Sequence, residues 1–269
     1  MMIDLIILSP ADLLIAASLV LILSALSVTQ RLNLARNLLV SASRAFVQLL
    51  LLGYVLDIVF ALRSPLWIML IALLMLVVAG REIMVRQHRR LTGWWGFGTG
   101  TVSMFISSFC VMLITLLLII NVEPWYHPQY LIPLLGMLLG NTMNGIASSL
   151  DRLLNDAWTE RQLIETRLAL GYTASEAIAG LRRSALRAGM IPIINSMAVA
   201  GIVSLPGMMT GQILSGSPPL EATKYQILIF FLIAAGTGFG AYGAVTLASK
   251  RLFDERQRLR LDRLQQPSA

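Results

Sequence analysis

Residues 97–120 read FGTGTVSMFISSFCVMLITLLLII and decide the fold class. The stretch contains no charged residue, and a helix of this length crosses the roughly 30 Å hydrocarbon core of a bilayer. Six further segments qualify as spans of about 20 mostly apolar residues, although the third is short: 10–29, 43–62, 65–80, 130–149, 190–213 and 225–248. We therefore predict an all-α integral membrane protein with about seven transmembrane helices, or six if the short segment 65–80 does not cross.

The overall composition supports this class. Hydrophobic residues make up 57% of the 269-residue chain and charged residues only 13%, whereas a soluble domain is about 45–50% apolar and about 25% charged. This excludes a disordered protein, a secreted disulfide scaffold and an ordinary cytosolic enzyme. The single cysteine, Cys110, has no partner for an internal disulfide.

The distribution of positive charge predicts the orientation. With seven spans, nineteen of the 21 Lys and Arg residues lie on one side of the membrane, and only Arg63 and Lys224 lie on the other. Because the basic side is normally cytoplasmic, we expect the N-terminus outside and the C-terminus inside. The net charge of +7 then requires no nucleic acid, and the basic cytoplasmic tail, 249–269, is expected to contact anionic lipid headgroups. A six-span arrangement would place an arginine cluster outside.

We predict one membrane-spanning domain over 1–269, with one long cytoplasmic loop at about 151–188. Its first part is compatible with a helix, which Gly171 would end. Thr173-x-x-Glu176 forms a capping box that starts the next helix. Such an elbow either transmits the movement of a soluble partner or merely caps the helical bundle as a hairpin.

Polar residues at membrane depth are the candidates for a transport path. Gln48, Asn141, Asn144 and Asn195 are expected to face the interior of the bundle, where they either line a path or hydrogen-bond between helices. In the segment SLPGMMTG at 204–211, Pro206 and Gly207 predict a break in the helix, which marks either a path or gate or a simple kink.

Two further observations concern metals and nucleotides. Methionine thioethers such as those at 208 and 209 are potential ligands for a soft ion, although packing is the commoner role of methionine. Two histidines and one cysteine do not make a Cys/His zinc site, and no P-loop motif is present. Any ATP-driven transport therefore requires an ATPase in another chain.

The sequence resembles the FetB-type permeases, the UPF0014 family, over about residues 44–227. The matching pieces are Arg44-Ala-x-x-Gln48, Gly53-Tyr54-Val55-Leu56, Ile132-Pro133-x-x-Gly136-Met137-x-x-Gly140-Asn141-x-Met143, Leu170-Gly171-x-Thr173, Ser204-Leu205-Pro206-Gly207-Met208-Met209-Thr210-Gly211 and Lys224-Tyr225-Gln226-Ile227.

The resemblance implies the permease subunit of an ABC exporter in the bacterial inner membrane. Two permeases would pair with two FetA-type ATP-binding subunits that bind ATP and Mg, while this chain itself would carry no cofactor and no catalytic site. The implied cargo is a metal ion, with iron as the bacterial substrate, and plant relatives are connected with aluminium tolerance. The metal ligands stay unassigned.

The resemblance also gives roles to residues. Glu165 and Gly171, six apart, are similar to the coupling loop of ABC permeases, although Thr166 and Arg167 replace its two alanines. The implied coupling residues are Glu165, Leu170, Gly171, Thr173 and Glu176. From the polar residues at membrane depth and the break described above, the predicted path or gate residues are Gln48, Asn141, Asn144, Asn195, Ser204, Pro206, Gly207, Met208 and Met209.

Two other functions remain open at this point. An ATP-independent carrier or channel predicts flux without nucleotide, and a non-transporting membrane scaffold predicts partner binding without flux.

Overall fold

The computed structural model describes residues 9–62 and 64–265, so Arg63 and the last four residues of the predicted tail lie outside the described residues. Within the described parts, six helices are long and apolar enough to cross a membrane. The all-α membrane class is therefore confirmed. The chain divides into two compact units, one formed by 1–64 with 214–217 and the other by 65–213 with 218–269.

The first unit is a helical hairpin. Its helices are α1 (Pro10–Thr29) and α2 (Ala35–Leu62). The Ser9 side chain caps α1 and Asp12 bonds back to the Ser9 amide, which completes a capping box. In the connection, the Ser27 hydroxyl accepts a hydrogen bond from the Leu34 amide.

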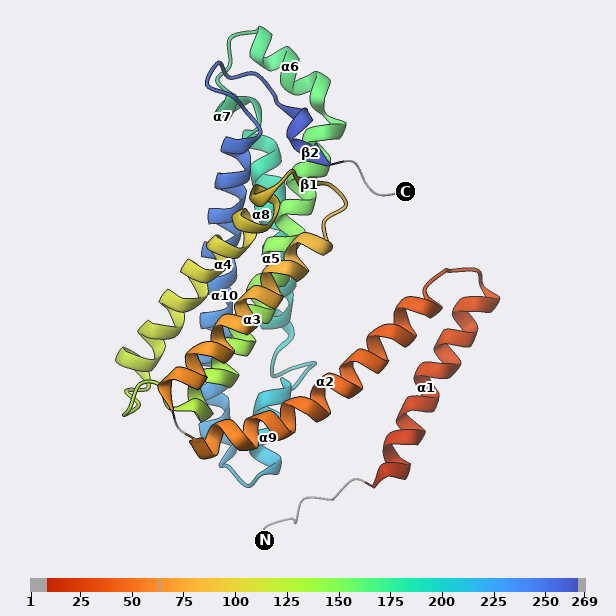
Figure 1. Cartoon of the computed structure of the whole chain (residues 1–269), viewed down its shortest axis with the longest axis vertical. Coiled ribbons are helices and arrows are strands. Elements are labelled where there is room, and N and C mark those ends of the chain that lie inside the picture. The colour runs from red at the N-terminus through yellow and green to blue at the C-terminus, as the bar shows by residue number, and fades with distance from the viewer. Residues whose placement is uncertain (1–8, 63, 266–269) are drawn as a thin grey trace. The chain divides into compact units, whose positions relative to one another are not determined.

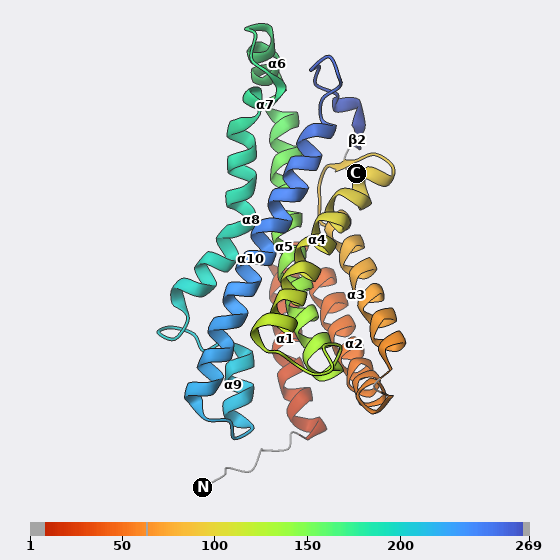
Figure 2. The same ribbon diagram turned by 90° about the vertical axis from the view of Figure 1, so that its left-hand side faces the viewer.

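The second unit is a bundle in which α5 and α10 are central. The helices are α3 (Pro65–Val85), α4 (Trp94–Ile114) with its π-helical extension η1 (Thr115–Ile119), α5 (Pro128–Thr159), α6 (Arg161–Ala169), α7 (Ala174–Ala177), α8 (Ala179–Val199), α9 (Gly207–Leu214) and α10 (Pro219–Arg251). α5 packs against α3, α4, α8 and α10, and α10 also packs against α4 and α8 (Figures 1 and 2).

Proline occupies the first position of several of these helices. α1, α3, α5 and α10 all begin at a proline, because the first helical amide needs no partner and proline already has the helical φ angle. The segment 65–80, which is short by sequence, belongs to the 21-residue helix α3. α3 is one of the six candidate spans among the described residues, so the count of six does not arise from the loss of this segment.

The segment predicted as a spanning helix at 190–213 is instead interrupted. α8 ends at Val199 and α9 begins at Gly207, and the Gly201 amide donates to the Ser204 carbonyl across the gap. The break predicted near Pro206 is thus confirmed. It begins earlier than the proline, because Gly201 adopts φ +80°, a conformation that glycine tolerates best.

Close helix packing in the second unit depends on small residues. A Cβ atom at Gly145 would meet Thr237 and the Gly189 carbonyl oxygen, and one at Gly240 would meet Ser107, Thr142 and Ile146. Gly240 of α10 is therefore in close contact with its neighbours. Glycine lets helix backbones approach closely in this way.

The end of the chain folds back on the bundle. η2 (Leu261–Arg263) leads into β2 (Leu264–Gln265), which pairs antiparallel with β1 (Arg90–Leu91) in the α3–α4 connection. The Arg263 guanidinium donates to the Arg251 and Phe253 carbonyl oxygens. The described part of the tail is therefore ordered structure attached to the bundle.

Candidate functional site: an elbow and a broken helix

The predicted elbow is a defined turn between helices. The Gly171 and Tyr172 amides donate to the Leu168 and Arg167 carbonyl oxygens, and Gly171 has φ +90°. This is the glycine-dependent helix end that the sequence predicted. Leu170 is 72% exposed and Tyr172 is 52% exposed, so the turn presents apolar side chains to its surroundings.

The predicted capping box at the start of α7 is confirmed. The Thr173 hydroxyl accepts from the Glu176 amide, and the Glu176 carboxylate accepts from the Thr173 amide at 2.9 Å. The Thr173 hydroxyl also donates to the Glu176 carboxylate at 2.7 Å. This contact, followed by the one from the Thr173 amide, lowers the pKa of Glu176. Glu165 lies exposed on α6, so the structure gathers all five proposed coupling residues in one surface segment.

Two contacts that the sequence did not predict brace this elbow. The Arg167 guanidinium donates to the Ala177 carbonyl oxygen at 2.8 Å, which ties α6 to α7. The Ala174 amide donates to the Gln257 side chain at 2.8 Å, which ties the tail to the elbow. The first contact joins residues 10 positions apart and the second joins residues 83 positions apart. Such contacts leave no periodic pattern in the sequence, so they could not be predicted from it.

The broken segment lies beside two separate cavities. Pro206 and Met209 line one of about 620 Å³, together with Gly201 and Gln226. Met208 lines another of about 310 Å³ with Met137. The adjacent methionines of α9 thus face different cavities, so the structure does not combine Met208 and Met209 in one ligand set. Gly207 begins α9, and Ser204 lies exposed in the break.

The groups that line these cavities are weak ligands for a cation. Thioethers, amides, hydroxyls and backbone groups line them, and the lining includes no carboxylate. Among the described residues, no group of three or more His, Cys, Asp or Glu residues is arranged to hold a metal ion. Such a lining offers a cation only weak ligands.

Gln226 is a candidate that the sequence analysis missed. It is buried, lines the larger cavity, and its side-chain oxygen has no hydrogen-bond partner in the described structure. An unpaired buried amide oxygen is costly, which makes it a natural contact for a passing cation. The rule that polar residues at membrane depth are informative applies equally to Gln226.

The predicted interior position of the asparagines is wrong for the described chain. Asn141 and Asn144 do share one face of α5, but both are exposed, and Asn195 is exposed on α8. The inner face of α5 is filled by leucine, isoleucine and small residues. Asn141 donates to the Met137 carbonyl oxygen, while Asn144 accepts from Arg86, just after α3.

The remaining predicted path residue, Gln48, is not brought together with these. It lies exposed on α2. It belongs to the first compact unit, whereas the other predicted path residues belong to the second.

Comparisons with known proteins place this arrangement in a family. The family model described as "Uncharacterised protein family (UPF0014)" matches residues 10–253. A UPF0014 membrane protein of Synechocystis is 39% identical over 86% of this chain and 88% of its own length. No solved structure matches significantly.

Two further relatives have names that refer to metals. Protein ALUMINUM SENSITIVE 3 of Arabidopsis thaliana is 36% identical over 82% of this chain and 80% of its own length. The "Probable iron export permease protein FetB" of Escherichia coli is 31% identical over 92% and 93%. Because the family model and these relatives cover most of the sequence, the chain belongs to the UPF0014 family of membrane proteins.

Proposed function

We propose that this chain is the permease subunit of an ABC exporter in the bacterial inner membrane, which moves metal ions, with iron as the expected cargo, out of the cytoplasm. A separate FetA-type subunit would bind ATP and Mg and hydrolyse the ATP. Two permeases and two ATP-binding subunits would form the transporter. The name of the Escherichia coli relative supports the cargo and the direction.

One structural observation carries the proposal. α8 is a single helix of 21 residues, with the elbow at its start and the break at its end. At 1.5 Å per residue it is about 30 Å long. A push on the elbow by an ATP-binding subunit would therefore reach the cavity beside Pro206 through one continuous helix.

The test is purification followed by reconstitution. The tagged chain is extracted in mild detergent, its partners are identified, and the purified complex is placed in vesicles with iron on the side of the ATP-binding subunit. We expect a P-loop ATPase to co-purify and iron to cross only when ATP and Mg are supplied. Flux without nucleotide would identify a carrier or channel, and a partner without flux would identify a scaffold.

A proline substitution tests the gate separately. Pro206→Ala restores a backbone amide and frees Leu205 to become helical, so α9 can extend into the break and close the cavity. We expect ATP-driven iron efflux to fall about tenfold or more, since an interior proline opposes helix by about 3 kcal/mol, with co-purification of the ATPase unchanged.

The matched control for this test is Pro192→Ala. Pro192 lies inside α8, which continues through it to Val199, so its removal changes no break. Efflux close to that of the wild type is expected for this variant. Equal efflux from the Pro206 and Pro192 variants would show that the break is only a kink.

A further inference from the structure

A basic cavity lies where α10 ends, apart from the broken helix. Its volume is about 670 Å³, and its lining includes five cationic side chains and two carboxylates. The cationic residues are Lys250, Arg251, Arg256, Arg258 and Arg263. The cavity therefore has an excess of positive charge and is suited to an anion.

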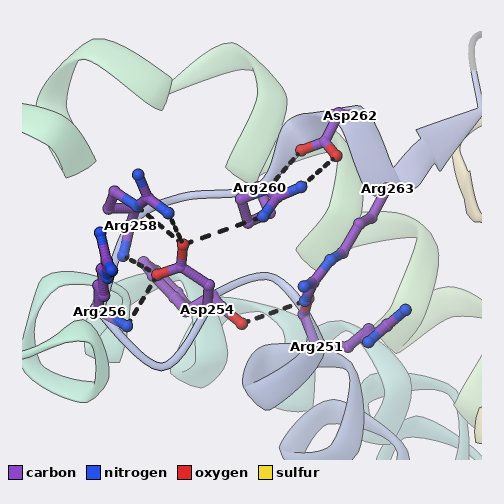
Figure 3. Close-up of polar contacts among 8 residues, drawn as sticks. Arg251, Asp254, Arg256, Arg258, Arg260, Asp262 and Arg263 are labelled. Carbon is purple, nitrogen blue, oxygen red and sulfur yellow. Dashed lines mark hydrogen bonds and ion pairs between the residues drawn. The ribbon is translucent and has the colours of Figure 1, made fainter.

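The carboxylate of Asp254 already accepts hydrogen bonds from residues of the tail. It accepts from the Arg256 and Arg258 amides and from the Arg258 guanidinium (Figure 3). These contacts, the Arg258 amide first, lower the pKa of Asp254. The carboxylate thus fixes the shape of the loop and engages Arg258, without neutralising the other cations.

Three cations remain available on the wall of the cavity. Lys250, Arg251 and Arg256 make no side-chain ion pair with a carboxylate among the described residues. The Arg251 guanidinium lies 4.8 Å from the ring centre of Trp95 and points away from Asp254 (Figure 3). Arginine held in this way presents a planar set of donors that matches a phosphate.

Apolar residues lie beside these cations. Trp95, Leu247 and Phe253 also line the cavity, and Trp94, next to Trp95 in the chain, is 86% exposed. Tryptophan concentrates where a membrane meets water. Val102, seven residues after Trp95 on the same side of α4, is also exposed, so an apolar surface leads from the cavity along the helix.

We propose that this cavity binds an anionic phospholipid, with its phosphate on Lys250 and Arg251 and an acyl chain along the Trp95 side of α4. Cations alone would suit any phosphate, but cations beside an exposed aromatic and aliphatic wall at the end of two membrane helices suit a lipid. The site is separate from the proposed transport path, because none of its residues lines the cavities at the break.

The experiment measures binding to the full-length purified protein. Native mass spectrometry and thermal unfolding are recorded after addition of phosphatidylglycerol, phosphatidylcholine, or inorganic phosphate alone. We expect phosphatidylglycerol to be retained and to raise the unfolding temperature, with the other two having little effect. Equal protection by inorganic phosphate would show that the ligand is a free phosphate compound. Equal retention of phosphatidylcholine would show that no anion site exists.

Paired variants locate the binding. Lys250→Gln with Arg251→Gln is expected to weaken phosphatidylglycerol binding about tenfold or more, since each basic residue near a lipid surface contributes substantially. Arg183→Gln with Arg187→Gln removes the same charge from the exposed face of α8, outside the cavity, and should bind nearly as the wild type does. Equal losses in the two pairs would overturn the assignment of the site. If the first pair fails to fold, the wild-type lipid comparison still decides the proposal.

Discussion

A Gly171→Arg variant should lose the ATP-binding subunit on purification and with it ATP-driven efflux. Gly171 has φ +90° at the elbow turn, where a residue with a side chain is strained by about 1–2 kcal/mol. That energy corresponds to about a fivefold to thirtyfold change in the population of the docking conformation. The new side chain would also project from the exposed surface that we expect the partner to bind.

The bundle itself should tolerate this substitution. A Cβ atom at Gly171 would meet nothing within 4 Å, so the variant should express and fold, with its unfolding temperature lowered only by the strain of the turn. Gly171→Asn is the matched control, because asparagine adopts positive φ more readily than other residues with side chains, and it should keep most of the partner. A Gly171→Arg protein that retains both partner and efflux would rule out the elbow as the coupling site.

The Gly189→Ala substitution is expected to lower the stability of the protein strongly. A Cβ atom there would lie 2.5 Å from the Gly145 carbonyl oxygen of α5, and closer still to the Ser149 hydroxyl. Backbone cannot yield to such a contact, so Gly189→Ala must push α8 away from α5. Overpacking of this kind costs about 1–3 kcal/mol, and we expect a clearly lower unfolding temperature in detergent.

Gly180→Ala provides the comparison on the same helix. A Cβ atom at Gly180 would meet nothing within 4 Å, and alanine favours a helix by about 1 kcal/mol over glycine. This variant should unfold at the wild-type temperature or slightly above it. Unfolding temperatures lowered equally by both substitutions would mean that Gly189 is not a close contact between the helices.

The sequence predicted the features that depend on local chemistry. The apolar segments, the capping box at Thr173, the glycine turn and the break before Pro206 each follow from the residue types within a few positions. The exposure of Asn141, Asn144 and Asn195 could not be predicted, since it depends on which neighbours fill the inner face of each helix. The contact between Gln257 and Ala174 joins distant segments, so it also lay beyond local patterns.

The return of the tail to the elbow has a consequence for biogenesis. The segment 252–265 is translated after all the helices it contacts, yet Gln257 completes the hydrogen bonding of the elbow and β2 holds the α3–α4 connection. Domains generally fold in the order in which they are made. The surface offered to an ATP-binding subunit would thus mature only after the membrane helices have been synthesised, and this order discourages assembly of a partner with an unfinished chain.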